Sequence, residues 1–212
     1  MSDFRVARSK HLTDAGFLKI TEDTIEGPDD ESFTRVTVRH FGAVVVVAVD
    51  GVRNAVMVRQ FRAAVGGDIL EVVAGKRDVD GEAPAVTAAR ELAEEVGLRA
   101  GRLIPLAEFY NSPGFTNEYT HMFLALELED LGAPETEGPE EREMTVERIP
   151  LAMVDRLIAT RGIVDAKSII GLSLARRFLS GEYGGLDDQG DLDPTSGNAD
   201  PASGNADGAV ES

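Results

Sequence analysis

Gly75–Leu98, which reads GKRDVDGEAPAVTAARELAEEVGL, is the stretch that decides the fold. Its second half is rich in Ala, Leu and Glu, which favour helix. Pro84 suits the first turn of a helix and Gly97 suits the position just after the last turn, so the stretch predicts a helix that ends near Gly97. We expect its apolar side to anchor it to a core through five residues: Val86, Ala89, Leu92, Ala93 and Val96.

Three carboxylates share one face of this helix. Glu91, Glu94 and Glu95 are spaced i, i+3 and i+4, so their repulsion costs a few tenths of a kcal/mol per pair. A solvated acidic face is the simplest interpretation. Against it, a glutamate in the last turn opposes the helix dipole, and Arg90 is placed one turn before Glu94, where it can orient a carboxylate. A hard divalent cation with oxygen ligands would turn the cluster into a binding site.

Composition limits the class of protein. The 212 residues are 42% hydrophobic and 28% charged, which is typical of one globular domain with at most a small appendage. A net charge of −17 argues against nucleic acid and anionic membrane surfaces as partners. The absence of cysteine excludes disulfides and thiolate catalysis. The first ten residues lack an apolar leader and Ala43–Val49 is too short to cross a bilayer, so we expect a cytoplasmic protein.

Alternating and continuous apolar runs predict the remaining elements. Strands are expected within Phe17–Val49, with a hairpin at Asp50-Gly51 that returns through Ala55–Val58. Further strands are expected at Ile69–Val73, Leu103–Tyr110, Tyr119–Leu128 and Met144–Ile149, and two amphipathic helices at Leu151–Ala159 and Ala166–Leu179.

The chain divides into three expected parts. Residues 1–40 form an N-terminal strand region, and residues 41–181 form the main domain. Residues 182–212 are acidic and contain neither Lys nor Arg, so they cannot bury enough apolar surface to offset the entropy of ordering. We therefore predict a disordered acidic tail.

At Gly75–Leu98 the chain resembles the Nudix hydrolases. Their motif has Gly, five residues, Glu, seven residues, then Arg-Glu-apolar-x-Glu-Glu-x-Gly-apolar; this chain has Gly75, six residues, Glu82, seven residues, then Arg90–Leu98 without mismatch. The extra residue falls around Asp80-Gly81, where an insertion is cheap, and it affects the loop rather than the helix.

Over roughly Phe17–Leu179 the chain is similar to the ADP-ribose pyrophosphatase branch of that family. Four segments carry this likeness: Val58–Arg62, Leu70–Gly75, Ser112–Phe115 and Asp165–Gly171. A departure is Val72-Val73, where the family usually has Leu-Pro. The resemblance implies an α/β (α+β) Nudix fold, with a mixed β-sheet core between helices and an N-terminal antiparallel strand region.

The resemblance also implies a metal site and a catalytic set. The metal ligands would be oxygen atoms of four residues: Glu91, Glu94, Glu95 and the backbone carbonyl of Ala74. Arg90 and Glu94 would take part in catalysis. The carboxylate acting as general base would be Glu140, with Glu141 as the alternative, because the loop aligns with the family in two registers that differ by one residue.

Substrate contacts are implied in two further places. Arg62 would hold a diphosphate, with Arg59 as a second candidate and with Glu71 nearby for substrate or a bound water. The loop residues Pro113, Gly114 and Phe115 would contact the substrate, with Phe115 either stacking on a flat ligand or serving as a packing plug.

The activity implied is Mg²⁺-dependent hydrolysis of ADP-ribose to AMP and ribose 5-phosphate, with Mn²⁺ as a possible substitute. Branch members are usually homodimers that exchange N-terminal strands, here roughly Phe17–Arg39. Two alternatives stay open: hydrolysis of another nucleoside diphosphate sugar or an oxidised nucleotide, and a non-catalytic Nudix module that binds a nucleotide.

Overall fold

The computed structural model describes residues 4–28, 31–134 and 142–182. Their contacts form two compact units. We call the described residues up to Gly42 together with Phe109–Thr120 the N-terminal unit, and Ala43–Glu108 together with the described residues from His121 to Glu182 the main unit. The limits 1–40, 41–181 and 182–212 stay predictions, and almost all of the expected tail lies outside the described residues.

The N-terminal unit contains a three-stranded antiparallel sheet in the order β1-β2-β3, formed by Arg5–Ala15, Leu18–Glu26 and Ser32–Arg39. The sequence predicted an N-terminal strand region at residues 1–40, but it gave no individual strand before Phe17, so β1 was not foreseen as a separate strand. Its residues, RVARSKHLTDA, have no regular apolar alternation, and all are exposed except the half-buried Ser9. The strand is defined by its pairing with β2 rather than by burial.

A buried carboxylate joins these three strands. Asp23 on β2 is 3% exposed and accepts hydrogen bonds from Ser9 Oγ on β1 at 2.5 Å and Thr21 Oγ1 at 3.1 Å. Arg39 Nη2 on β3 lies 2.6 Å from its Oδ2. Burial raises the pKa of Asp23, but hydrogen bonds from Ser9 and Thr37 and the charge of Arg39 outweigh it, and the pKa is lowered.

The main unit is built on a six-stranded sheet in the order β7-β8-β4-β6-β5-β9. Its strands are β4 Ala43–Val49, β5 Asn54–Arg62, β6 Gly67–Lys76, β7 Leu98–Tyr110, β8 Tyr119–Asp130 and β9 Thr145–Pro150. The hairpin expected at Asp50-Gly51 is confirmed, since β4 pairs with the start of β5. β6 then changes partners, because its Gly67–Val72 half pairs with β5 and its Val73–Lys76 half with β4.

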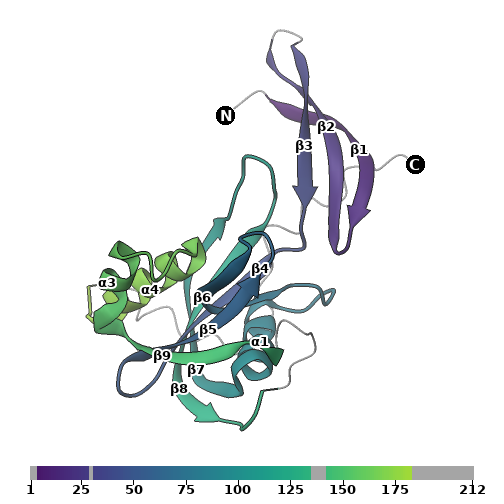
Figure 1. Ribbon diagram of the computed structural model, residues 1–212. Helices are drawn as coiled ribbons and strands as arrows, with labels where there is room; N and C mark the ends of the chain where they lie inside the picture. The colour runs from purple at the N-terminus through teal and green to yellow at the C-terminus, as the bar shows by residue number, and fades with distance from the viewer. Residues whose placement is uncertain (1–3, 29–30, 135–141, 183–212) are drawn as a thin grey trace. The chain divides into compact units, whose positions relative to one another are not determined.

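Helices cover both faces of this sheet (Figure 1). Helix α1, Pro84–Val96, packs through Leu92 on a cluster that includes Val46 of β4. Helix α4, Ala166–Leu179, contacts the other face, where a Cβ on Gly171 would lie 2.6 Å from Val47 Cγ2. Val46 and Val47 are neighbours in one strand, so they point to opposite faces. The expected sheet between helices is therefore confirmed.

Two short helices precede α4. The 3-10 helix η2, Leu151–Met153, and helix α3, Val154–Ala159, occupy the range predicted as one helix. No helix within the described part of the chain is long and apolar enough to cross a membrane.

The buried side of α1 differs in part from the prediction. Leu92 and Val96 are buried as expected, but Val86, Ala89 and Ala93 are only half-buried. The other buried positions of the helix are Pro84, Ala85, Thr87 and Ala88. Apolar residues lie on more than one side of this helix, so the sequence could not tell which side meets the sheet; small side chains on the true side let it approach closely.

Candidate active site

Helix α1 ends as its sequence predicted. Pro84 lies in the first turn, and Gly97 closes the helix with φ 63°, its N–H donating to the carbonyl of Ala93 at 2.9 Å. A Cβ on Gly97 would also lie 2.1 Å from the carbonyl oxygen of Gly132. Both the backbone angle and this contact require glycine, and they fix where the last turn places its glutamates.

Glu91 lies directly over β6. A Cβ on Gly75 would lie 2.0 Å from Cδ of Glu91, so in this rotamer the carboxylate fits against the strand because residue 75 is glycine. Ala74, whose carbonyl the sequence proposed as a metal ligand, is the preceding residue of the same strand. The structure therefore brings Ala74 and Glu91 into one neighbourhood.

The electrostatic environment of Glu91 favours a cation. Burial raises the pKa of Glu91; Arg90 opposes this, while the negative charges of Glu94 and Asp78 add to it, and the net pKa is raised. Such a carboxylate is short of positive charge when ionised. A divalent cation would supply it, so the site suits a metal ion.

Arg90 is the centre of the ion pairs on this helix. Its guanidinium lies 3.3 Å from Glu82 Oε2, 3.0 Å from Glu91 Oε1 and 2.9 Å from Glu94 Oε2. Burial lowers the pKa of Arg90, but the three carboxylates raise it by a larger amount, so the net pKa is raised. The contact with Glu94 is the one expected from the spacing; the contact with Glu82, eight residues earlier, was not foreseen.

The carboxylates of Glu91, Glu94 and Glu95 do not converge on a single point. Across residues 4–28, 31–134 and 142–182, no three His, Asp or Glu side chains converge as metal ligands. Glu91 and Glu94 are directed at Arg90 instead. The donors nevertheless fit a hard cation, because Glu91, Glu94, Glu95 and the carbonyl of Ala74 offer only oxygen. Holding an ion requires glutamate side chains to turn from Arg90 toward it.

The two candidate phosphate-binding arginines have different surroundings. Arg62 Nε donates to Glu71 Oε2 at 2.6 Å, whereas Arg59 Nε donates to Glu147 Oε1 on β9 at 2.6 Å. Three residues apart on β5, the two side chains point to opposite faces of the sheet. The structure therefore does not bring Arg59 and Arg62 together, and Arg62 is the better candidate for a diphosphate.

Glu71 is a buried carboxylate rather than an open one. It is 2% exposed, and Lys167 Nζ of α4 lies 3.5 Å from its Oε1. Its other oxygen, Oε2, accepts the hydrogen bond from Arg62. The sequence gave Lys167 no role. Its only signal was its place in the Asp165–Gly171 segment, because a contact across so many residues leaves no local pattern.

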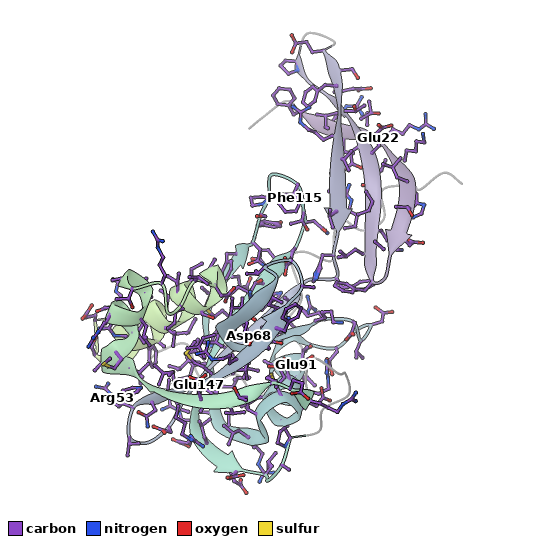
Figure 2. The ribbon with its side chains drawn as sticks, in the orientation of Figure 1. Glu22, Arg53, Asp68, Glu91, Phe115 and Glu147 are labelled. Carbon is purple, nitrogen blue, oxygen red and sulfur yellow. The ribbon has the colours of Figure 1, made fainter. Side chains whose placement is uncertain are left out.

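The candidate substrate loop belongs to the N-terminal unit. Phe115 N donates to Ser112 O at 3.1 Å around Pro113 and Gly114, and Val38 N donates to Phe115 O at 2.7 Å. Phe115 is 57% exposed, so it does not serve as a packing plug within the described chain (Figure 2). The candidate bases Glu140 and Glu141 lie outside the described residues.

A cavity of about 610 Å³ lies elsewhere in the main unit, beside the β4–β5 turn and the end of α4. Its arginines are engaged locally, since Arg53 Nη2 donates to Leu179 O at 2.5 Å and Arg176 pairs with Asp155. None of the glutamates of α1 lines it. The cavity is thus separate from the candidate metal site.

Residues 38–165 match the family model described as the NUDIX domain. The chain belongs to the Nudix hydrolase family. It is 38% identical over 170 residues to the ADP-ribose pyrophosphatase of Mycobacterium tuberculosis, covering 80% of this chain and 82% of that one. It is 39% identical over 146 residues to the ADP-ribose pyrophosphatase of Bacillus subtilis, covering 69% and 78%.

A solved structure supports the same Nudix fold. The crystal structure of an ADP compounds hydrolase superposes with a TM-score of 0.73 at 21% identity, covering 86% of this chain and 97% of that one. Together with the α1 site, the family match and the named relatives make this chain a Nudix pyrophosphohydrolase. Enzymes of this family generally use divalent metal ions, which agrees with the oxygen donors on α1.

Proposed function

We propose that this Nudix hydrolase is an Mg²⁺-dependent ADP-ribose pyrophosphatase that releases AMP and ribose 5-phosphate. The observation that carries the proposal is Glu91 held against Gly75, with Arg90 joining Glu91 and Glu94. This arrangement places carboxylates on α1 beside the backbone of β6. The names of the relatives from M. tuberculosis and B. subtilis support ADP-ribose as the substrate.

The metal ligands in this proposal are Glu91, Glu94, Glu95 and the carbonyl of Ala74. Bound Mg²⁺ would polarise the phosphate oxygens and lower the pKa of an attacking water. Arg90 holds the carboxylates in place when the metal is absent, because it contacts Glu91 and Glu94 directly. A proton acceptor for the water is still required, and Glu140 or Glu141 remains the prediction for it.

The diphosphate is assigned to Arg62. Its Nε is used by Glu71, and the two Nη groups lie on the remaining sides of the guanidinium. A guanidinium can hold two phosphate oxygens at once, which a lysine cannot copy. Such local positive charge is needed because the chain as a whole carries −17 and repels anionic substrates.

A substrate panel tests the proposal. The purified protein is mixed with Mg²⁺ and ADP-ribose, other nucleoside diphosphate sugars or an oxidised nucleoside triphosphate, and the products are separated by chromatography. We expect AMP from ADP-ribose at the highest kcat/KM, and no product from any substrate with Glu95→Gln. Faster turnover of another member identifies the alternative substrate, whereas tight binding without turnover by the wild type identifies a nucleotide-binding module.

We also propose a homodimer formed through the N-terminal sheet. Several large apolar side chains of this unit are exposed, namely Phe4, Val6, Leu12, Phe17 and Val36. Burying them against a second copy would remove this apolar surface from water. Analytical ultracentrifugation should give a dimer, and Val6→Asp with Val36→Asp should shift it toward monomer; a monomeric wild type at micromolar concentration contradicts the proposal.

A further inference from the structure

Strand β6 changes partners between Val72 and Val73, and the start of α4 contacts the strand at that point. Val72 pairs with Met57 of β5, while Val73 pairs with Val46 of β4. The N–H of Val72 donates to Ser168 Oγ at 2.9 Å, which links this point of the sheet to α4. Ser168 is fully buried, so this contact belongs to the core of the main unit.

Asp165 fixes the start of α4. Its Oδ2 accepts hydrogen bonds from Ser168 N at 2.8 Å and from Ser168 Oγ at 2.7 Å, as a helix cap does. Its Oδ1 lies 2.6 Å from Lys167 Nζ. Burial raises the pKa of Asp165, but the charge of Lys167 and the bonds from Lys167 and Ser168 outweigh it, so the pKa is lowered. The Asp165 carboxylate therefore stays ionised and holds the ammonium of Lys167.

Lys167, held by Asp165, also contacts Glu71. The ammonium lies 3.5 Å from Glu71 Oε1, and the other oxygen, Oε2, accepts from Arg62 Nε at 2.6 Å. Glu71 is 2% exposed, so water cannot replace either cation. A buried carboxylate that loses one of its partners is left with uncompensated charge, and it moves or changes its protonation. The direction of the Arg62 guanidinium thus depends on Lys167 through Glu71.

We propose that Lys167 is a positioning residue for phosphate binding, which holds Glu71 in the orientation that presents Arg62 to the diphosphate. The inference rests on the proposed function, in which Arg62 binds the diphosphate of the substrate. It assigns Glu71 to the support of Arg62 instead of to a substrate or water contact. It also gives a role to the Asp165–Ser168 turn, which lies nearly a hundred residues from the strand that it orders.

The test separates positioning from stability by means of KM. Lys167→Met keeps the length of the side chain and removes its charge, and we expect KM for ADP-ribose to rise about tenfold with a small change in kcat. Lys167→Arg keeps the charge and should recover most of the loss. Arg176→Met is the matched control, because Arg176 lies on the same helix as Lys167 but pairs with Asp155 of α3, and its loss should leave KM unchanged. Thermal unfolding is recorded for each variant.

A double-mutant cycle tests the path through Arg62. Arg62→Ala alone should raise KM, and adding Lys167→Met to it should raise KM no further, because the guanidinium to be positioned is gone. Equal effects of Lys167→Met with and without Arg62 overturn the inference. So does an unchanged KM, or a fall in kcat and melting temperature at constant KM, since that pattern is purely structural.

Further results distinguish failure of this inference from failure of the proposed function. If Lys167→Met does not fold, Glu71→Gln is tested in its place. Glu71→Gln alone should raise KM as Arg62→Ala does, and the double variant should have the same KM as Arg62→Ala. An additive rise of KM in the double variant overturns the inference. A wild-type protein that leaves ADP-ribose intact overturns both the proposed function and this inference. An active wild type with an unaffected Lys167→Met variant overturns the inference alone.

Discussion

Glu91 on helix α1 occupies the space in which a side chain at Gly75 on strand β6 would begin. The missing Cβ of Gly75 would lie 2.0 Å from Cδ and 2.2 Å from Cγ of Glu91. A Cβ and this Glu91 rotamer cannot share that space, so glycine at position 75 allows the Glu91 carboxylate to lie against the strand. The first residue of the motif and the first carboxylate of the candidate metal site are thus in direct contact.

Gly75→Ala should therefore damage the site more than its size suggests. The flexible Glu91 side chain must change rotamer, so we expect metal affinity and kcat to fall at least tenfold with little loss of stability. Gly51→Ala is the matched control, because nothing lies within 4 Å of its Cβ position. Activity at saturating Mg²⁺ and urea unfolding are measured for both. Equal effects of the two substitutions would show that the close approach is unimportant.

Glu95→Gln should strongly lower turnover while leaving the fold intact. The substitution removes one charged oxygen donor from the candidate metal site, and we expect kcat to fall by about a hundredfold or more. The control is Glu129→Gln, an exposed carboxylate paired with Arg99 on β7 and β8. The rates are compared over a range of Mg²⁺ concentrations. A Glu95→Gln enzyme with normal kcat would remove this residue from the metal site.

Metal binding should release protons. Burial and the neighbouring charges of Glu94 and Asp78 raise the pKa of Glu91 when no metal is bound, and a bound cation favours its ionised form. Binding of Mg²⁺ therefore displaces the proton, and more protons are released as the pH falls toward the raised pKa. Calorimetry in buffers of different ionisation enthalpy measures this number. Glu91→Gln should abolish the release, and a proton count that is independent of pH would contradict the assignment.

The N-terminal sheet should lose stability in acid because of Asp23. Its folded-state pKa lies below the usual aspartate value, so the carboxylate contributes stability above that usual value, and the contribution is lost as the pH falls through the folded pKa. Unfolding of the full chain is followed between about pH 2 and pH 6, where aspartates titrate. Asp23→Asn should flatten this dependence, whereas Asp14→Asn, at an exposed pair with His11, should not.

The general base should be recognised by its effect on kcat. Glu140→Gln is expected to lower kcat at least a hundredfold with KM little changed, because a base acts on the attacking water and not on substrate binding. Glu141→Gln is measured beside it, since the two residues are adjacent. An effect confined to KM would assign the residue to substrate binding, and a larger kcat effect at Glu141 would reverse the choice.

Local patterns in the sequence predicted most of the elements. Apolar periodicity located the buried strands β4 and β5, and Pro84 with Gly97 located both ends of α1, because these signals arise within a few residues. Strand β1 was not predicted individually, although it lies in the expected strand region 1–40. Its side chains are almost all exposed and show no regular apolar alternation, so only the pairing with β2 makes it a strand.

By itself, the sequence determined that Glu91, Glu94 and Glu95 lie on one helical face with Arg90 beside them, since the helical repeat fixes those directions. The tertiary structure alone decided the rest of the site. It set Gly75 beneath Glu91, separated Arg59 from Arg62 and placed Lys167 beside Glu71. The physical reason is that these contacts join separate elements, and they exist only once packing of the helices and strands has fixed their distances.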